Sequence, residues 1–219
     1  MIHVVSSTNR HLCEDAIETH FHIRHDIFVG ERRWQALARA DGKEIESYDN
    51  VDAVYLLAME GHRIIGGHRL CPTIGPTMID QVFPMLAAVR GVPSDPLIWE
   101  WSRFFVVRDR REGRVNLELM AAGQEFCLDE GITHVSAVME IRWLPRLQQA
   151  GFVVHPLGLL AVVEGSWTMA ALIEISADTL ERVRDIGNIP GSVLTRKGPQ
   201  YSIVDRAMTG YRMAAENRL

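Results

Sequence analysis

Two charged side chains interrupt the apolar segment 97–107, which we predict to be the central strand of a sheet. Glu100 and Arg103 would be buried there, and burying a charge is costly unless the charge is paired or used. Burial raises the pKa of a glutamate towards neutrality, which suits a general base. An ion pair that only stabilises the sheet is an equal alternative.

Side chains alternate between the two faces of a strand. Ile98, Glu100, Ser102 and Phe104 are expected on one face, and Trp99, Trp101, Arg103 and Phe105 on the other. Arg103 therefore lies opposite Glu100 unless a bulge intervenes.

A second cluster combines aromatic, basic and acidic side chains in the first fifty residues. Arg24 and Phe28 are four residues apart and share one face of a predicted helix. Trp34 follows in a long connection, before the acids Glu46 and Asp49. Acids and aromatic faces suit a cation, and arginine suits a carboxylate, so the cluster indicates a pocket for a cation that carries a carboxylate. The alternative is a solvated acidic loop, the commoner fate of such runs.

Two further features involve arginine. The pair Gly66 and Gly67 in a strand indicates a bulge or close approach by a ligand, and Arg69 follows as either a site residue or a surface residue. An excess of arginine near the end of the central strand is suited to the phosphates of a cofactor or to an acidic carrier protein, or it forms a solvated loop. Its members are Arg103, Arg108, Arg110, Arg111 and Arg114.

Several classes of protein are disfavoured by composition. The net charge of −5 argues against a nucleic-acid binder driven by overall charge. Three cysteines without Cys-x-x-Cys spacing indicate neither a disulfide framework nor a zinc knuckle, and they fit a reducing cytoplasm. We find no signal peptide and no apolar run of about 18 residues, so we expect no membrane span.

Known catalytic and ligand-binding motifs narrow the choice further. His20, His22 and His25 do not share a helix face and lack partners at metal-ligand spacing, so no metal site is expected. Hydrolase, P-loop and dinucleotide-binding patterns do not occur in the sequence.

The pattern of apolar residues predicts one α/β domain, residues 1–219, with a mixed sheet. We expect strands at 2–5, 54–59, 63–71, 97–107, 134–139, 152–155 and 168–175, with the second and third forming a hairpin. Helices are expected at 9–28, capped by Asn9, and at 82–89, 116–130, 141–149 and 177–186. Residues 29–50 form a long connection, and 187–219 are less regular.

Together these residues resemble the LuxI-type acyl-homoserine-lactone synthases, the autoinducer synthases of quorum sensing in Gram-negative bacteria. The resemblance covers residues 1 to about 175. It rests on five motifs in register: Arg24-x3-Phe28-x5-Trp34, Glu44-x-Glu46-x-Tyr48-Asp49, Arg69-Leu70-x-Pro72-Thr73, Phe83-Pro84 and Trp99-Glu100-x-Ser102-Arg103-Phe104.

The resemblance implies an acetyltransferase-like (GNAT-like) fold: a twisted mixed sheet flanked by helices and split by a cleft. It implies two substrates, S-adenosylmethionine and an acyl thioester, and no permanently bound cofactor. The acyl group moves to the methionyl amine, and the carboxylate then closes on the γ-carbon, releasing methylthioadenosine and a homoserine lactone. The expected place of action is the cytoplasm.

The resemblance also implies roles for particular residues. Glu100 and Arg103 are expected at the catalytic centre, with Glu100 as the base. S-adenosylmethionine is expected to bind at Arg24, Phe28, Trp34, Glu46, Asp49 and Arg69, and the acyl group among Phe83, Trp101, Met139 and Trp143. Thioester or coenzyme A contacts are expected from Ser102, Phe104, Phe105, Val106, Arg108, Arg110 and Arg111.

Some positions depart from the usual family pattern. Glu46 replaces the usual aspartate, which leaves its contact open. Trp101 and Trp143 favour a short branched or aromatic acyl group if they point into the cleft, and are core residues otherwise. Arg110-x-x-Gly113 resembles part of a coenzyme A loop, although Val115 replaces its expected small residue. The chain therefore resembles the subgroup that uses acyl-coenzyme A to make products such as isovaleryl-homoserine lactone.

Three alternatives stay open at this point. The donor can instead be acyl carrier protein, which most of the family uses. A plain N-acyltransferase of the same fold would make an amide without releasing methylthioadenosine. A non-catalytic regulatory protein on this scaffold would not depend on Glu100.

Overall fold

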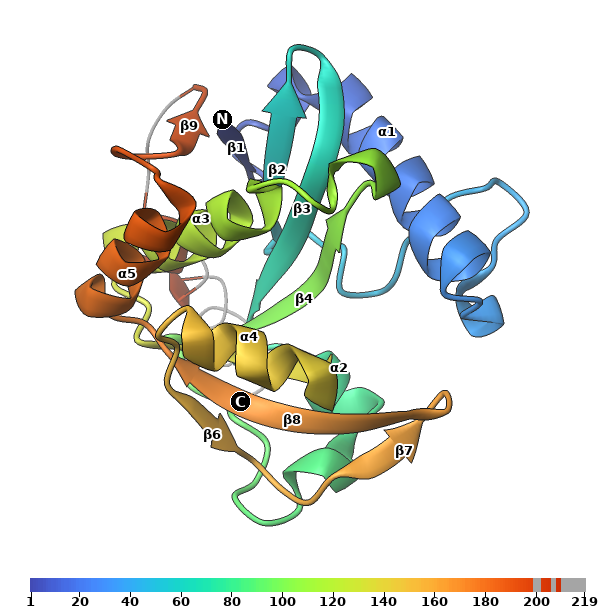
Figure 1. Cartoon of the computed structure of the whole chain (residues 1–219). Coiled ribbons are helices and arrows are strands. Elements are labelled where there is room, and N and C mark those ends of the chain that lie inside the picture. Colours follow the sequence, from blue (N-terminus) through green and yellow to red (C-terminus); the bar gives the residue numbers. More distant parts are fainter. Residues whose placement is uncertain (199–201, 206–207, 210–219) are drawn as a thin grey trace.

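A computed structural model of the protein describes residues 1–198, 202–205 and 208–209. Within these residues, nine strands form one twisted mixed sheet in the order β6-β8-β5-β4-β3-β2-β1-β9, with β7 also paired to β8 (Figure 1). Only β1–β9 and β4–β5 are parallel pairs. The strands are β1 (Ile2–Val5), β2 (Val54–Glu60), β3 (Arg63–Pro72), β4 (Ile98–Val106), β5 (His134–Glu140), β6 (Val154–Pro156), β7 (Ala161–Val163), β8 (Ser166–Glu174) and β9 (Leu194–Arg196). The expected mixed α/β sheet is confirmed.

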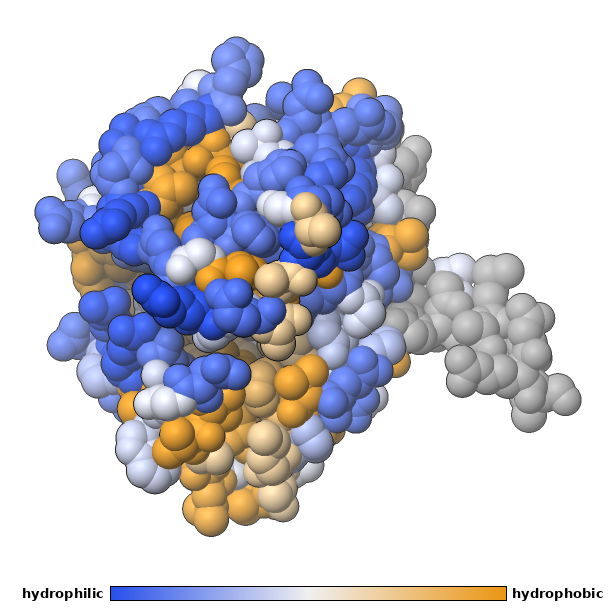
Figure 2. Space-filling model, turned by 90° about the vertical axis from the view of Figure 1, so that its right-hand side faces the viewer, coloured by the Kyte–Doolittle hydropathy of each residue, from blue (hydrophilic) through white to orange (hydrophobic). Residues whose placement is uncertain are grey.

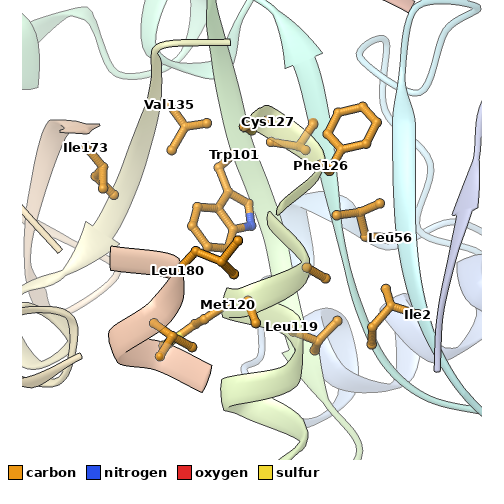
Figure 3. Close-up of a cluster of buried hydrophobic side chains, with 14 of the residues drawn as sticks. Ile2, Leu56, Trp101, Leu119, Met120, Phe126, Cys127, Val135, Ile173 and Leu180 are labelled. Atoms are coloured by element: carbon orange, nitrogen blue, oxygen red, sulfur yellow. The ribbon is translucent and has the colours of Figure 1, made fainter. Parts of the chain in front are cut away.

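Helices cover both faces of this sheet. The α-helices are α1 (Glu14–Arg24), α2 (Met78–Gln81), α3 (Val115–Asp129), α4 (Leu144–Gln149) and α5 (Ala177–Gly187). A π-helical turn, His25–Glu31, extends α1, and single 3-10 turns lie at Arg10–Leu12, Gln35–Leu37, Pro84–Ala87, Arg108–Arg110 and Ile141–Trp143. One core cluster joins α3 and α5 to the sheet, with Trp101 in its middle (Figure 3), and a second joins α1 to the opposite face. Because both faces are covered, β2 reads as a continuous apolar run.

The two glycines of β3 allow close packing of neighbouring segments. A Cβ at Gly66 would lie 2.9 Å from the Leu119 side chain and 2.9 Å from the Phe105 carbonyl, so only a glycine lets α3 pack this close. The bulge expected here is confirmed, since Gly66 pairs with Ala58 while Ile64 pairs with Met59.

A second bulge changes the direction of side chains along β4. Arg69 pairs with Ser102 and Gly67 with Phe105, so Arg103 and Phe104 together face a single residue of β3. Arg103 has a φ of 54°, in the left-handed region. Strict alternation is therefore wrong beyond Ser102. Arg103 turns to the α1 face, the face of Glu100, and Phe104 turns to the α3 face.

The sheet opens between β4 and β5. These parallel strands pair only over Ile98–His134, Trp99–Val135 and Glu100–Ser136. Beyond that point β4 stays with β3 up to Val106, and β5 stays with β8 up to Glu140. The two halves of the sheet thus diverge as two arms, an upper one with β3 and a lower one with β8 (Figure 1).

Several predicted boundaries are wrong for local reasons. α1 begins at Glu14 and not at Asn9, whose side chain instead bonds Ser6, Val4 and Lys197. The helix expected at 82–89 is instead α2, capped by the Thr77 side chain, followed by one 3-10 turn. β7 was not predicted, nor was β9 within the segment 187–219. Of that segment, residues 199–201, 206–207 and 210–219 lie outside the described residues.

Hydrophobic side chains gather on the lower part of the face shown in Figure 2, whereas its upper part is mostly polar around a smaller hydrophobic patch. The exposed apolar side chains include Leu159, Val162 and Trp167, on and beside β7. The surface is therefore more polar near α1 than near β7.

Candidate active site

A cavity of about 700 Å³ occupies the opening between the two arms. Its upper wall is aromatic and charged, with Phe28, Arg32, Trp34, Glu46 and Arg103. Its lower wall is mostly apolar. The lower wall includes Val82, Phe83, Val138, Met139, Trp143, Leu147 and Val163. Glu100, Trp101, Ser102 and Phe104 line the cavity along β4. The expected cleft is thus present, and its two walls differ in chemistry.

Six charged side chains, two of them in the upper wall and four behind it, form a closed ring of ion pairs, which we call the charge ring. Each arginine pairs with two carboxylates, and each carboxylate with two arginines. In order, the members are Arg24, Glu44, Arg103, Glu46, Arg69 and Asp49. The N···O distances are 3.1 Å (Arg103–Glu44), 2.5 Å (Arg103–Glu46), 3.1 Å (Arg69–Glu46), 2.9 Å (Arg69–Asp49) and 2.6 Å (Arg24–Asp49). Three positive and three negative charges cancel.

The charge ring is almost completely buried. The side chains of Arg24, Glu44, Arg69 and Asp49 are inaccessible, and Glu46, 15% exposed, is the most open member. Burial alone would raise the pKa of Glu44, but Arg103 and Arg24 lower it below the ordinary value. Burial also opposes ionisation of Asp49, but Arg69 and Arg24 lower its pKa strongly. Both carboxylates are therefore charged at neutral pH.

Hydrogen bonds within the acidic loop (residues 44–49) and to its neighbours hold this loop in place. The Asp49 carboxylate accepts a hydrogen bond from the Glu46 amide at 2.8 Å and another from the Tyr55 hydroxyl at 3.0 Å. The Glu44 amide donates to the Phe21 carbonyl at 3.1 Å, which ties the loop to α1. The reading of this segment as a solvated acidic loop is therefore wrong.

Aromatic faces lie next to the charge ring. The rings of Phe28 and Trp34 stack at 5.3 Å, and the Arg103 guanidinium lies 5.4 Å from the Phe28 centroid. Arg32 lies over the same two rings and bonds Glu140 of β5 at 3.1 Å, so it connects the upper wall with the lower arm. A guanidinium on these faces indicates that they accept cations.

Glu100 is held separately from the charge ring. One carboxylate oxygen accepts a hydrogen bond from the Met78 amide at 2.9 Å and the other from the Ile79 amide at 3.0 Å. Burial raises the pKa of Glu100, and these amides and the nearby arginines offset the shift only in part. Arg103 pairs with Glu44 and Glu46, so the structure does not show the Glu100–Arg103 ion pair considered from the sequence. Glu100 is an oriented carboxylate with a raised pKa at a cavity wall, the arrangement of a general base.

The four residues expected around an acyl group all line the cavity. Trp143 is half-buried, and its ring packs edge-on against Phe104 at 5.7 Å. Trp101 is 8% exposed, so it belongs to the core and to the cavity wall at once.

Other expected contact residues lie outside the cavity lining. Phe105 packs in the core on the α1 face. Arg110 pairs with Glu60 and Asp109. Arg111 pairs with Glu31 and donates to the Val106 carbonyl. Arg108 and its neighbours form the turn between β4 and α3. Ser102 and Phe104 line the cavity. The three arginines of this turn, Arg108, Arg110 and Arg111, are not among its lining residues.

Glu44 was missed as a site residue. Its alternation with Glu46 was visible in the sequence, but burial of an acid depends on partners from α1 and β4 that only the fold brings together.

In the part of the chain that the structure describes, no helix is both long and apolar enough to cross a membrane. The same residues hold no group of three or more His, Cys, Asp or Glu placed to bind a metal ion.

The amino-acid sequence matches a known protein family. The family model described as autoinducer synthase matches residues 9–183. The chain belongs to the autoinducer synthase family. It is 61% identical over 207 residues to the isovaleryl-homoserine lactone synthase of Bradyrhizobium diazoefficiens, with 94% of each protein covered. It is 32% identical to the acyl-homoserine-lactone synthase of Ralstonia nicotianae, covering 78% of this chain and 86% of the relative. The resemblance to LuxI-type synthases is confirmed.

Solved structures agree with this assignment. BjaI, a CoA-dependent acyl-homoserine lactone synthase determined with SAM and isopentyl-CoA, is 61% identical with a TM-score of 0.93, covering 95% of this chain and 99% of BjaI. MesI, also a CoA-dependent acyl-homoserine lactone synthase, is 36% identical with a TM-score of 0.84, covering 89% and 99%. A protein from Lactobacillus plantarum named as an N-acetyltransferase shares the fold at 16% identity, with a TM-score of 0.54 over 80% of this chain and 99% of that protein. The acetyltransferase-like fold is confirmed.

The charge ring predicts a large cost for losing one member. In Glu44→Gln, Arg24 and Arg103 each lose a charged partner, and a buried positive charge is left uncompensated. We expect a loss of about 3–5 kcal/mol in the free energy of unfolding at neutral pH, measured by urea denaturation. The matched control is Glu60→Gln, which breaks the exposed pair with Arg110 and should cost much less.

The same comparison has a pH dependence. The pKa of Glu44 is lowered in the folded state, so its contribution is present above the ordinary glutamate pKa and is lost as the pH falls below it. The gap in stability between the wild type and Glu44→Gln should therefore shrink on acidification. A gap that stays constant into the acid range would contradict this role for Glu44.

Proposed function

We propose that this chain is an acyl-homoserine-lactone synthase that transfers a short branched acyl group from acyl-coenzyme A to the amine of S-adenosylmethionine and then closes the lactone. The observation that carries the proposal is a single cavity with a charged, aromatic wall, an apolar wall and Glu100 between them. The 61% identity to an isovaleryl-homoserine lactone synthase supports it.

S-adenosylmethionine would bind at the upper wall. Its sulfonium would lie against the faces of Phe28 and Trp34, which already accept guanidinium groups. Arg103 and Glu46 line the cavity and would contact this substrate directly. Arg24, Asp49 and Arg69 lie behind them. They would act by holding the charge ring together.

The first step is acyl transfer. Glu100 removes a proton from the substrate ammonium, directly or through a water molecule, because only the neutral amine is a nucleophile. The amine nitrogen attacks the thioester carbonyl, the carbon–sulfur bond breaks, and the thiolate leaves and takes up a proton. The oxyanion needs backbone donors, and the edge of β4 that faces β5 has no strand partner beyond Glu100, where the pairing of these two strands ends. We propose this part of the strand, up to Val106, as the donor.

The second step is lactonisation. The substrate carboxylate attacks the γ-carbon, and the electron pair of the breaking bond moves to the sulfonium sulfur, which leaves as neutral methylthioadenosine. This step needs little acid–base help, because the sulfonium is already a good leaving group. Holding the methionyl chain folded between the two walls supplies the main assistance.

The acyl group would lie on the lower wall. Trp101, Phe104, Trp143, Met139 and Phe83 enclose that side of the cavity with apolar surface. Bulky rings leave room for a short branched chain.

The preferred donor is acyl-coenzyme A, supported by two CoA-dependent structural relatives. Arg108, Arg110 and Arg111 lie on the turn before α3, and phosphate groups would compete there with the present acidic partners of Arg110 and Arg111. We further propose one catalytic domain over residues 1–219, acting in the cytoplasm.

The deciding experiment measures methylthioadenosine and lactone from purified protein, S-adenosylmethionine and isovaleryl-coenzyme A. Isovaleryl-acyl carrier protein serves as the parallel donor. If only isovaleryl-acyl carrier protein gives product, the acyl donor is the carrier protein and not coenzyme A. An acyl amide without methylthioadenosine would indicate a plain N-acyltransferase, and no product from either donor would refute the proposal.

Glu100→Gln should remove the base and keep the size of the side chain, but it loses one of the two hydrogen bonds from the Met78 and Ile79 amides, because the glutamine nitrogen cannot accept. We expect kcat to fall roughly 10²- to 10⁴-fold, with a lower melting temperature from the lost hydrogen bond but a protein that is still folded at the assay temperature. In the wild type, the acid limb of kcat/KM should lie above the ordinary glutamate pKa, because burial raises the pKa of Glu100. Glu174→Gln, an acid outside the cavity lining, is the control. Full turnover by Glu100→Gln would exclude this base.

Trp143→Ala should widen the lower wall. Because Trp143 is half-buried and lines the cavity, we expect the ratio of kcat/KM for octanoyl- over isovaleryl-coenzyme A to rise. Trp101→Ala should act in the same direction with a larger loss of stability, since Trp101 is also core. Trp167→Ala, exposed on β8, should leave the ratio unchanged. An unchanged ratio in a folded Trp143→Ala would show that Trp143 does not limit the acyl chain.

A further inference from the structure

The Trp101 side chain lines the cavity and its ring lies against Gly123 of helix α3, so its position depends on what lies behind it. A Cβ at Gly123 of α3 would lie 3.3 Å from both Cζ2 and Cη2 of Trp101, tighter than ordinary van der Waals contact. A glycine inside a helix costs about 1 kcal/mol relative to alanine, so this position needs a reason for having no side chain. The room that it gives to the Trp101 ring is such a reason.

His68 of β3 also lies against the Trp101 ring, next to Gly123. Its ring lies 4.9 Å from the Trp101 ring and 5.8 Å from the Phe104 ring. It is fully buried, and neither of its ring nitrogens has a hydrogen-bond partner among the described residues. Burial lowers the pKa of His68 to about 3, so the imidazole is neutral and packs as an aromatic side chain. A Cβ at Gly123 would also lie 3.2 Å from the His68 Cε1 atom, so the two residues adjoin.

The remaining neighbours restrict how Trp101 can move. The bulge at Arg103 places Phe104 on the same face, 5.9 Å from the Trp101 ring, and Phe152 lies 6.4 Å away. Helix α3 cannot retreat easily, because it packs closely against β3 at Gly66 and against α5. Trp101 lines the cavity, so a ring displaced from behind has open space on the cavity side.

We propose that Gly123 and His68 form a back wall that sets how far Trp101 reaches into the cavity, and so determine the size of the acyl group that the enzyme accepts. This inference rests on the proposed synthase function. It assigns specificity to two residues that contact no substrate and act through the ring in front of them.

The back wall predicts opposite effects for filling and emptying it. Gly123→Ala adds a methyl group behind Trp101, pushes the ring forward and shortens the acyl pocket. The ratio of kcat/KM for isovaleryl- over acetyl-coenzyme A should then fall roughly tenfold, the lower end of what one methylene decides in an apolar pocket. His68→Ala leaves space into which Trp101 can withdraw, so the ratio for octanoyl- over isovaleryl-coenzyme A should rise.

The control is Gly191→Ala, at a glycine where a Cβ would meet no atom within 4 Å. It should keep both ratios at the wild-type value. The KM for S-adenosylmethionine should stay unchanged in all three variants, because that substrate would bind on the other wall. If the wild type accepts only carrier-protein donors, the same acyl series is measured on the carrier protein.

Each outcome separates this inference from the function on which it rests. A wild type that releases no methylthioadenosine with any acyl donor refutes the proposed function. An active wild type with folded Gly123→Ala and His68→Ala variants that keep both ratios overturns the back wall alone. If only one variant folds, its ratio decides. If neither folds, the back wall is a structural requirement and its role in acyl choice is overturned.

Discussion

The charge ring is the interaction on which the rest of the active site depends. Its six members come from α1, the acidic loop, β3 and β4, so four segments far apart in the sequence are fixed to one another by charge. Each ion has lost most of its water, and removing any one would leave its neighbours buried and unbalanced. The loss of any one member is therefore expected to destabilise the whole ring strongly. Phe28 and Trp34 pack against Arg103 of the charge ring, so the ring also holds the aromatic wall in place.

The bulge in β4 connects the charge ring to the opposite side of the sheet. By adopting a left-handed conformation, Arg103 reaches the carboxylates on the α1 face. The same extra residue turns Phe104 to the α3 face, beside Trp101. One local backbone irregularity thus completes the charged wall and adds a ring to the apolar wall, and a regular strand would do neither.

Long apolar patterns made much of the fold predictable. The β2–β3 hairpin, β4, α3 and β5 lie within about two residues of their expected positions, because burial on one or both sides leaves a clear periodicity. Short elements such as β7 and β9 carry too few residues for a pattern. The site was predictable where residue type decides, as for Glu100. The site was not predictable where pairing in three dimensions decides, as for Glu44. It was also not predictable at Arg103, which adopts a backbone conformation that is usual for glycine.

The divergence of β4 and β5 after three residue pairs has an evolutionary consequence. Residues 24–49 build most of the upper wall, whereas residues 78–83 and 137–168 build the lower one, so most substitutions in one wall leave the segments of the other unchanged. Under the proposed function, a lineage can alter the chemical message it sends by substitutions in the lower arm while the reaction itself persists. Neighbouring species that share the charged wall and differ in the apolar one would then release distinct signals and communicate without interfering with each other.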